Sequence, residues 1–267
     1  MALRRIGPAA VPPLVEMLSD KDQGVRQAAA WTLCKFGPEA RAAIPALTNA
    51  LKDKDCLVRS WAAGTLGRIG PEAKTAVPAI AELLNDKEWL VRREAADALR
   101  KIGPEAGAAI PALAESLQDR EYVRQGAASA LARIGPAAVP ALTEAMKDKD
   151  ASIRLTAACA LKDVGSEAAR TAIPVLAELL KNKDEMIRRA ATLALMKIGP
   201  DEAKAVTPAM MELLKERDGR VRQAAASVLG AIAPRANAAV PALVKLLEDP
   251  DCRRVAALAL VGIGPRE

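Results

Sequence analysis

The sequence contains no histidine and very few aromatic residues. Phe, Trp and Tyr together make up 2% of its 267 residues. Histidine is the commonest general base and metal ligand in proteins, so its absence excludes the usual serine–histidine and cysteine–histidine catalytic pairs. The shortage of aromatic rings excludes a wide core of the conventional kind, which such rings normally fill. The chain must instead pack thin layers of Ala, Leu, Ile and Val.

Other common signals are missing as well. The four cysteines, Cys34, Cys56, Cys159 and Cys252, show no CxxC spacing. We therefore interpret them as small apolar fillers in a reducing compartment. The apolar stretches fall short of the roughly 18 residues that cross a membrane, and the first residues lack the apolar run of a signal peptide. We expect a cytoplasmic protein.

The charge distribution gives no sign of a nucleic-acid-binding tail. The chain carries 39 basic and 33 acidic side chains, a net charge of +6. Residues 1–134 and residues 135–267 each carry +3, so neither half concentrates the positive charge. The sequence has no GxGxxG or Walker A string and no cluster of metal ligands. We predict no cofactor, no metal site and no catalytic residue.

The dominant feature that is present is an internal repeat. A Gly-Pro turn, or a close substitute, recurs along the whole chain. Ending each unit at that glycine or its alanine substitute gives eight units, residues 8–37, 38–70, 71–103, 104–135, 136–165, 166–199, 200–233 and 234–264. A period near 33 residues is typical of stacked helix pairs. We predict one repeat domain over residues 1–267, with residues 1–7 as the remnant of a preceding helix.

Each unit repeats the same local signals. An apolar residue followed by proline, as at Ile44-Pro45, opens a first helix, the A helix, because proline fits the first helical turn. An acidic turn follows, and its second acid is placed to cap a second helix, the B helix. The predicted caps are Asp22, Asp55, Asp150, Asp184 and Asp218, with Glu88 as a weaker substitute. The B helix carries an apolar stripe, which in the third unit consists of Val91, Ala95, Leu99 and Ile102. A glycine then ends the B helix.

A charged motif accompanies the start of each B helix. An acid is followed six residues later by the arginine of a Val-Arg or Ile-Arg pair, and four units show the full spacing: Asp20 with Arg26, Asp53 with Arg59, Asp86 with Arg92, and Asp148 with Arg154. With this motif the repeat resembles the HEAT repeat, an armadillo-like helical repeat, in the short bacterial form often labelled phycobilisome-lyase-like. The resemblance implies an arginine–acid ladder that links neighbouring units. Together with the periodicity it predicts an all-α, right-handed solenoid of about eight HEAT-like helix pairs.

Four units depart from this spacing. Asn182 and Glu216 replace the acid, Asp119 lies one residue closer to its arginine, and Asp249 lies two residues closer. In the regular units each arginine has an acid in its own repeat. We therefore interpret the row of arginines as structural and not as a track for phosphates.

The pattern runs to both ends of the sequence. We expect a fragment of a longer array, because neither end shows a polar capping helix. In the last unit, four apolar side chains would have no following layer: Leu243, Leu247, Leu258 and Ile263. We therefore expect end-to-end self-association through the terminal units.

The B helix also has positions that point away from its apolar stripe, two, six and nine residues after the valine position. In HEAT-like solenoids the B helices line the inner curve, and exposed apolar or arginine side chains there mark interaction sites. The candidates for partner binding are Trp31, Arg93, Arg100, Leu155, Arg189, Leu193, Met196, Arg254 and Leu258. The alternative is that tight packing buries these side chains against the next B helix.

The predicted function is a non-catalytic scaffold that binds a protein or peptide on this concave surface. Two alternatives stay open. A bilin-chromophore lyase subunit follows from the family label alone, and the missing histidine and scarce aromatics argue against it. A DNA-binding HEAT-like protein of the alkyl-base glycosylase kind would need a basic concave channel, and the even charge argues against it. We expect no membrane partner.

Overall fold

The computed structural model describes residues 7–164, 166–196, 203–232 and 236–264, which form helices joined by short turns, with no strand among them. The predicted all-α solenoid of helix pairs is confirmed. The chain divides into two compact units, one ending at Ala141 and one beginning at Leu142. The grouping into eight repeats within one domain stays a prediction. Residues 1–6 of the expected remnant helix lie outside the described residues.

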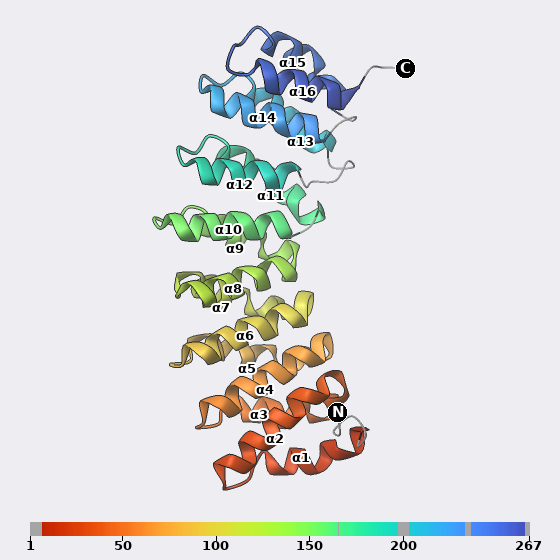
Figure 1. The fold of residues 1–267 in the computed structure, drawn as a ribbon, viewed down its shortest axis with the longest axis vertical. Coiled ribbons are helices and arrows are strands. Elements are labelled where there is room, and N and C mark those ends of the chain that lie inside the picture. Colours follow the sequence, from red (N-terminus) through yellow and green to blue (C-terminus); the bar gives the residue numbers. More distant parts are fainter. Residues whose placement is uncertain (1–6, 165, 197–202, 233–235, 265–267) are drawn as a thin grey trace. The chain divides into compact units, whose positions relative to one another are not determined.

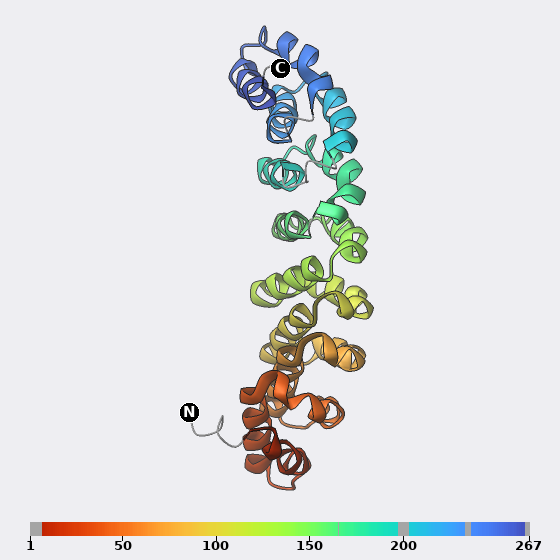
Figure 2. The same cartoon turned by 90° about the vertical axis from the view of Figure 1, so that its right-hand side faces the viewer.

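In the first unit the A and B helices form separate layers (Figures 1 and 2). The A helices are α1 (Val11–Met17), α3 (Ile44–Ala50), α5 (Val77–Glu82) and α7 (Ile110–Glu115). The B helices are α2 (Gln23–Phe36), α4 (Cys56–Ile69), α6 (Trp89–Ile102) and α8 (Glu121–Ile134). Each B helix packs against its own A helix, and successive B helices pack against one another from α2 to α8. The hydrophobic core of this unit therefore runs continuously between the layer of A helices and the layer of B helices.

Short 3₁₀ helices connect the repeats of the first unit. Before the A helices they are η2 (Gly7–Ala10), η3 (Gly37–Ala43), η4 (Gly70–Ala76), η6 (Gly103–Ala109) and η8 (Pro136–Ala138). Two more follow A helices, η5 (Leu83–Asn85) and η7 (Ser116–Gln118). Most of the first group begin at the Gly-Pro turn, and α3 then begins at Ile44, as predicted.

The second unit keeps the two-layer arrangement (Figure 2). Its B helices are α10 (Ala151–Asp163), α12 (Glu185–Met196), α14 (Gly219–Ala231) and α16 (Arg253–Ile263). Its A helices are α11 (Ser166–Leu179), α13 (Ala203–Leu213) and α15 (Val240–Leu246), the last preceded by η9 (Asn237–Ala239), and the boundary between units falls within α9 (Val139–Ala145). The prediction that the A helix starts just before proline is wrong for α11, which contains Pro174 in its interior; α13 likewise contains Pro208 in its interior. Ser166 replaces the proline that opens the 3₁₀ turn in other repeats, and regular helix takes the place of that turn.

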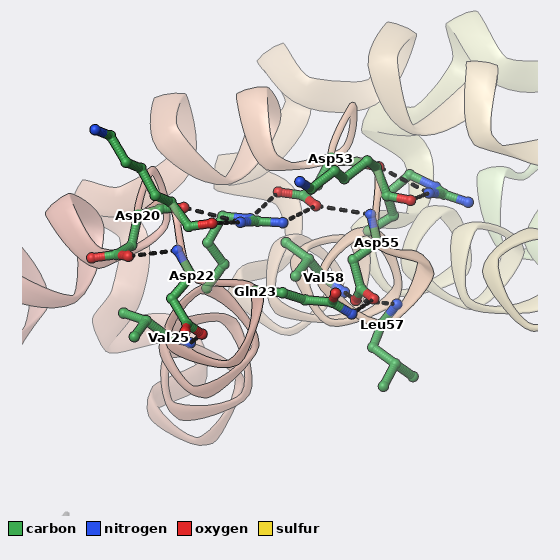
Figure 3. A network of polar contacts seen from close by, with 12 residues as sticks. Asp20, Asp22, Gln23, Val25, Asp53, Asp55, Leu57 and Val58 are labelled. Carbon is green, nitrogen blue, oxygen red and sulfur yellow. Dashed lines mark hydrogen bonds and ion pairs between the residues drawn. The ribbon is translucent and has the colours of Figure 1, made fainter.

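The predicted aspartate caps of the B helices are confirmed. The Asp22 carboxylate accepts hydrogen bonds from the Gly24 and Val25 amides, and that of Asp55 accepts them from Leu57 and Val58 (Figure 3). Asp150, Asp184 and Asp218 each accept one such bond. Glu88 accepts none, so the prediction that it is a weaker substitute cap is wrong. Several B helices end at a glycine with positive φ: Gly37, Gly70, Gly103, Gly135 and Gly264.

Small residues let successive B helices approach closely. A Cβ atom built on Gly67 of α4 would lie 2.6 Å from the Ala98 Cα atom of α6. In the second unit, a Cβ on Gly230 of α14 would lie 2.8 Å from the Ala259 Cα atom of α16. These contacts explain why alanine saturates the B helices while aromatics are scarce, since only small side chains fit between backbones this close.

The cysteine interpretation holds for three of the four thiols. Cys252 is buried, and Cys34 and Cys56 are half-buried, but Cys159 is exposed. The filler interpretation is therefore wrong for Cys159, which lies on the side of α10 opposite its apolar stripe. None of the described helices is both long and apolar enough to cross a membrane.

Candidate functional site

The arginines near the start of the first unit's B helices each donate hydrogen bonds in two directions. Arg59 Nη1 donates to the main-chain oxygens of Asp53 and Lys54, at 2.8 and 3.2 Å. Its Nε and Nη2 donate to the two carboxylate oxygens of Asp86 in the next repeat, at 2.7 and 2.8 Å. Both side chains of this pair are only 9% exposed. The pair is therefore a bidentate, nearly buried link between adjacent repeats.

We call such an arginine–aspartate pair between adjacent repeats a rung of the ladder. The repeats on both sides of the Arg59–Asp86 rung have one as well. Arg26 pairs with Asp53 at 2.7 Å, and Arg92 pairs with Asp119 at 2.5 Å. Every rung spans 27 residues and joins one repeat to the next. The implied ladder is thus present in the first unit.

The direction of the pairing differs from the sequence motif. The motif couples Asp20 with Arg26, but Arg26 contacts only the main-chain oxygen of Asp20, at 3.0 Å. The Asp20 carboxylate instead accepts a hydrogen bond from the Asp22 amide, at 2.8 Å (Figure 3). The expectation of a carboxylate partner inside the same repeat is therefore wrong. The turn directs the acid away from its own arginine, and the carboxylates of Asp53, Asp86 and Asp119 instead pair with the arginine of the preceding repeat.

The ladder is incomplete in the second unit. Arg222 pairs with Asp249 at 2.5 Å, as in the first unit. Arg154 donates to the main-chain oxygen of Asp148 at 3.0 Å, but among the described residues of this unit its carboxylate contact is with the capping residue Asp184, at 3.4 Å. Asn182 stands at the ladder position there and supplies no carboxylate. The rung from Arg154 is therefore long and indirect.

Arg188 differs most from the ladder pattern. Its Nη1 donates to the main-chain oxygens of Asn182 and Lys183, both at 2.8 Å, as in the other repeats. Its Nε and Nη2 have no acceptor among the described residues. Glu216, at the ladder position of the next repeat, pairs instead with Lys181 at 3.1 Å. Arg188 is nevertheless 7% exposed, so a guanidinium edge lacks a carboxylate at a nearly buried position.

The two shortened spacings leave their rungs intact. Asp119 and Asp249 both accept an arginine from the preceding repeat. The shorter spacing changes only the arginine of their own repeat. Arg124 Nε donates to the Leu117 oxygen at 2.9 Å, and Arg253 Nε donates to the Leu247 oxygen at 3.1 Å.

Hydrogen bonding and burial set the acidity of the carboxylates in this region. Burial alone would raise the pKa of Asp86, but the bonds from Arg59 hold that pKa below its usual value. The bond from Arg92 is the main cause of a lowered pKa at Asp119. Burial raises the pKa of Glu94, which lies against Gly64 in the first unit. In the second unit, bonds from Arg220 lower the pKa of Asp218 to about 2.

Two of the candidate binding residues of the first unit, Trp31 and Arg93, are exposed, and all three contact neighbouring side chains. Trp31 is 43% exposed, and the Lys35 ammonium lies 5.0 Å from its ring centroid. Arg93 lies 5.4 Å from the ring centroid of Trp89. Arg100 is half-buried and pairs with Asp97 at 2.6 Å, and the same carboxylate also pairs with Lys101 at 2.5 Å. The partner-binding role of these residues stays a prediction.

The second unit exposes several apolar side chains at the candidate positions. On α12, Leu193 and Met196 are 42% and 38% exposed. Arg189 on the same helix and Arg254 on α16 are exposed as well. Leu155 is half-buried, so tight packing covers part of that position.

The last helix pair only partly matches the expected open face. Leu258 is 62% exposed, whereas Leu243 and Ile263 are buried and Leu247 is half-buried. Leu243 and Ile263 lie on the facing helices α15 and α16 and belong to the core of the pair itself. End-to-end self-association stays a prediction.

A groove lies between α12 and α14 in the second unit. Its volume is about 530 Å³, and Arg188, Arg189 and Leu193 line its α12 side. Gln223 and Ser227 line its α14 side. Two candidates from the sequence, Arg189 and Leu193, therefore meet here with an arginine that had been assigned to the ladder.

Sequence reasoning missed most of the other groove residues. Gln223 and Ser227 lie two and six residues after Val221, so the same offsets applied to the seventh repeat would have found them. Lys183 and Arg220 also line the groove, but they lie in or next to the turns before α12 and α14. No periodic signal marks such turn positions.

The comparisons agree with this architecture. A family model described as HEAT repeats matches residues 1–54, 44–132, 110–172 and 203–263. The match is to HEAT repeats in general, and the narrower phycobilisome-lyase-like label stays a prediction. No curated protein matches the chain significantly.

Solved structures with a similar fold include engineered repeat proteins. One engineered protein is 27% identical, with a TM-score of 0.54 over 98% of this chain and 80% of that chain. A computationally designed armadillo repeat protein, made for modular peptide recognition, is 21% identical, with a TM-score of 0.50 over 71% of this chain and 100% of that chain. The family match, the two-layer fold and the arginine ladder lead to one conclusion: the chain belongs to the family of HEAT-repeat proteins.

Proposed function

We propose that the chain is a non-catalytic scaffold that binds a protein or peptide on the exposed face of its B helices. The observation that carries the proposal is the solvent exposure of Leu193 and Met196 on α12. The opposite side of the same helix is fully used for the core, since Ile187, Ala191 and Leu195 are buried. Exposed apolar residues next to a groove are a common mark of an interaction surface.

The fold suits such a role for a physical reason. The B helices are already ordered by caps and by packing, so a partner would bind without ordering the scaffold backbone. The designed armadillo protein with a similar fold was made for peptide recognition. That likeness supports peptide binding as a use of this fold, and the surface residues of this chain decide its partner.

The alternatives have less support. Phosphate binding by the arginine row is disfavoured, because Arg26, Arg59, Arg92 and Arg222 already pair with aspartates. A bilin lyase would need a pigment pocket with groups that orient the pigment, and the described part of the chain gives no observation that favours this alternative. The proposal therefore remains with a protein or peptide partner.

The test removes the exposed apolar side chains of α12 and leaves the buried core residues of that helix unchanged. Replacing both Leu193 and Met196 by serine should change the free energy of unfolding by about 1 kcal/mol or less, because both side chains are exposed. The double variant should lose the peptides that wild-type protein enriches from a displayed random library.

The matched control is Val244→Ser on the A helix α15, where valine is 50% exposed. It removes a comparable apolar side chain from the other layer and should retain the same peptides. A library that yields no peptide for the wild-type protein would contradict the proposed function. Equal retention by the double variant and the wild type would contradict the assigned surface.

A further inference from the structure

The groove between α12 and α14 contains a nearly buried arginine whose ladder partner is missing. In Arg59 and Arg92, Nε and Nη2 donate hydrogen bonds to the carboxylate of the aspartate in the next repeat. Arg188 keeps the main-chain contacts of Nη1, but no described residue accepts from its other two nitrogens. A bidentate carboxylate site is therefore half-built at this position.

The missing partner has been redirected elsewhere. Glu216 occupies the position of the ladder aspartates, and its carboxylate contacts Lys181 at 3.1 Å. The pKa of Lys181 is raised, first by its bond to Glu216 and next by its bond to Glu178. Glu216 therefore gives Arg188 no hydrogen bond, although it stands at the right place in the sequence. Asp218 acts on Arg188 only through its charge and accepts no hydrogen bond from it.

The charge around the groove favours an anionic ligand. Two further cations line it, Lys183 and Arg189, and both are exposed without an ion pair to another described residue. Arg220 also lines it, but Asp218 neutralises that side chain through contacts at 2.8 and 3.1 Å. Glu185 is the one acid among the lining residues. The net charge available to a ligand is therefore positive.

The walls of the groove provide apolar contact beside these charges. Leu193 from α12, Ala224 from α14 and Val255 from α16 line it. A volume of about 530 Å³ accommodates a few side chains of an extended segment. Cationic and aliphatic groups thus lie within one site.

We propose that this groove binds an acidic peptide segment, with a side-chain carboxylate on the open edge of Arg188 and a neighbouring aliphatic side chain against Leu193. The proposal rests on the proposed scaffold function and names the chemistry of its partner. The ligand carboxylate takes the place that the ladder aspartates occupy in other repeats. Arg188 would therefore bind the partner's carboxylate in the same way as the other ladder arginines bind the aspartate of the next repeat.

A nucleic acid fits the same site less well. The groove lining contains no aromatic side chain on which a base could stack. The ladder arginine of the next repeat, Arg222, is already paired with Asp249, so the free cations do not continue as a track along the helices. An isolated carboxylate-sized site beside aliphatic walls matches an acidic peptide.

The decisive experiment gives Arg188 an aspartate partner from the chain itself. Glu216→Asp preserves the net charge and places the shorter carboxylate as in Asp53, Asp86 and Asp119. Peptides selected by the wild-type protein from a displayed random library should contain Asp or Glu next to an aliphatic residue. Their affinity, measured by fluorescence anisotropy, should fall about tenfold in Glu216→Asp, because the new aspartate competes for Arg188.

A second variant tests the proposal even if the aspartate introduced at position 216 does not reach Arg188. Arg188→Lys keeps the charge but removes the bidentate edge, and it should also weaken binding about tenfold. The control Arg217→Lys changes an exposed arginine nearby that does not line the groove, and it should bind as the wild type does.

The outcomes separate the two proposals. Selected peptides that lack acids, or acidic peptides that bind Arg188→Lys as tightly as the wild type, would overturn the groove proposal and leave the scaffold function standing. The same result would follow if a single-stranded oligonucleotide bound the wild type and lost affinity in Arg188→Lys while acidic peptides did not. Failure to select any peptide would overturn both proposals.

Discussion

The two compact units use the same arginine motif with different results. In the first unit, Arg26, Arg59 and Arg92 are each closed by an aspartate of the next repeat. In the second unit, the contact of Arg154 is long and Arg188 has no hydrogen bond to a described carboxylate, whereas Arg222 pairs with Asp249. The difference follows from two positions, Asn182 and Glu216, where the ladder aspartate is absent.

The comparison shows how a repeat protein can convert a structural element into a binding element. The arginine and its main-chain contacts are unchanged at Arg188. Only the acid in the following repeat differs: Glu216 pairs with Lys181, which leaves one edge of the guanidinium open. A stabilising rung and a ligand site are therefore separated by a single side chain.

The largest expected effect contrasts a closed rung with an open one. Arg59→Ala should lower the free energy of unfolding by about 2–4 kcal/mol, because it leaves the nearly buried Asp86 carboxylate and two main-chain oxygens unpaired. Arg188→Ala should cost only about 1 kcal/mol, because it strands no carboxylate. Amide hydrogen exchange, followed separately over the helices of each unit, measures both losses locally. Equal losses at the two positions would show that the main-chain contacts alone stabilise these turns.

A smaller effect should be the same in both units, because both pack their B helices in the same way. Gly67→Ala and Gly230→Ala each push a Cβ atom into the backbone of the next B helix. Overpacking costs about 1–3 kcal/mol, and the helix propensity of alanine offsets about 1 kcal/mol of that. Chemical denaturation should therefore show a net loss of about 1–2 kcal/mol for each variant.

The control for the glycine variants is Gly107→Ala. A Cβ atom there meets nothing within 4 Å, so the variant should be nearly neutral. A loss at Gly67 without a loss at Gly230 would mean that the second unit relaxes its helix spacing more easily than the first.

The smallest effect concerns acidity in the first unit. Burial raises the pKa of Glu94 in the folded protein, so the folded state binds more protons than the unfolded state above the ordinary glutamate pKa of about 4.3. Stability from this group therefore falls as the pH rises through that window. Glu94→Gln should equal the wild type near pH 4 and exceed it at pH 7, by about 0.5 kcal/mol in thermal denaturation.

The ladder aspartates should give the opposite slope. The pKa values of Asp86 and Asp119 are lowered in the fold, so their contribution is present above the ordinary aspartate pKa and is lost as the pH falls through the lowered values. A Glu94→Gln protein that lost stability at neutral pH would show that the Glu94 carboxylate makes a favourable contact in its charged form.

Local features of the fold could be predicted from the sequence, because their causes lie within a few residues. The caps at Asp22 and Asp55 and the helix end at Gly70 each depend on one turn. The direction of the ladder could not be predicted in this way. The partner of Arg59 depends on where Asp86 lies in the next repeat, which the six-residue motif does not specify.

The candidate site shows the same limit. The helical offsets identified Leu193 as exposed, and the structure agrees, but they also selected Leu155, which is half-buried. Arg100, also selected, forms an ion pair with Asp97 three residues earlier. The groove itself escaped prediction because it depends on Glu216 pairing with Lys181 instead of Arg188. Such competition between partners is decided by side-chain reach and not by periodicity.

The short sequence span of every rung also bears on how the chain folds. Each closed rung joins residues 27 apart, and each B helix packs against the one in the adjacent repeat. Contacts of this kind give a low contact order, so folding needs no early meeting of distant segments. A nucleus of two neighbouring repeats can form at several places and grow in either direction. The closed rungs around Arg59 make the first unit the better place to begin, and the open edge at Arg188 marks a step where growth should pause.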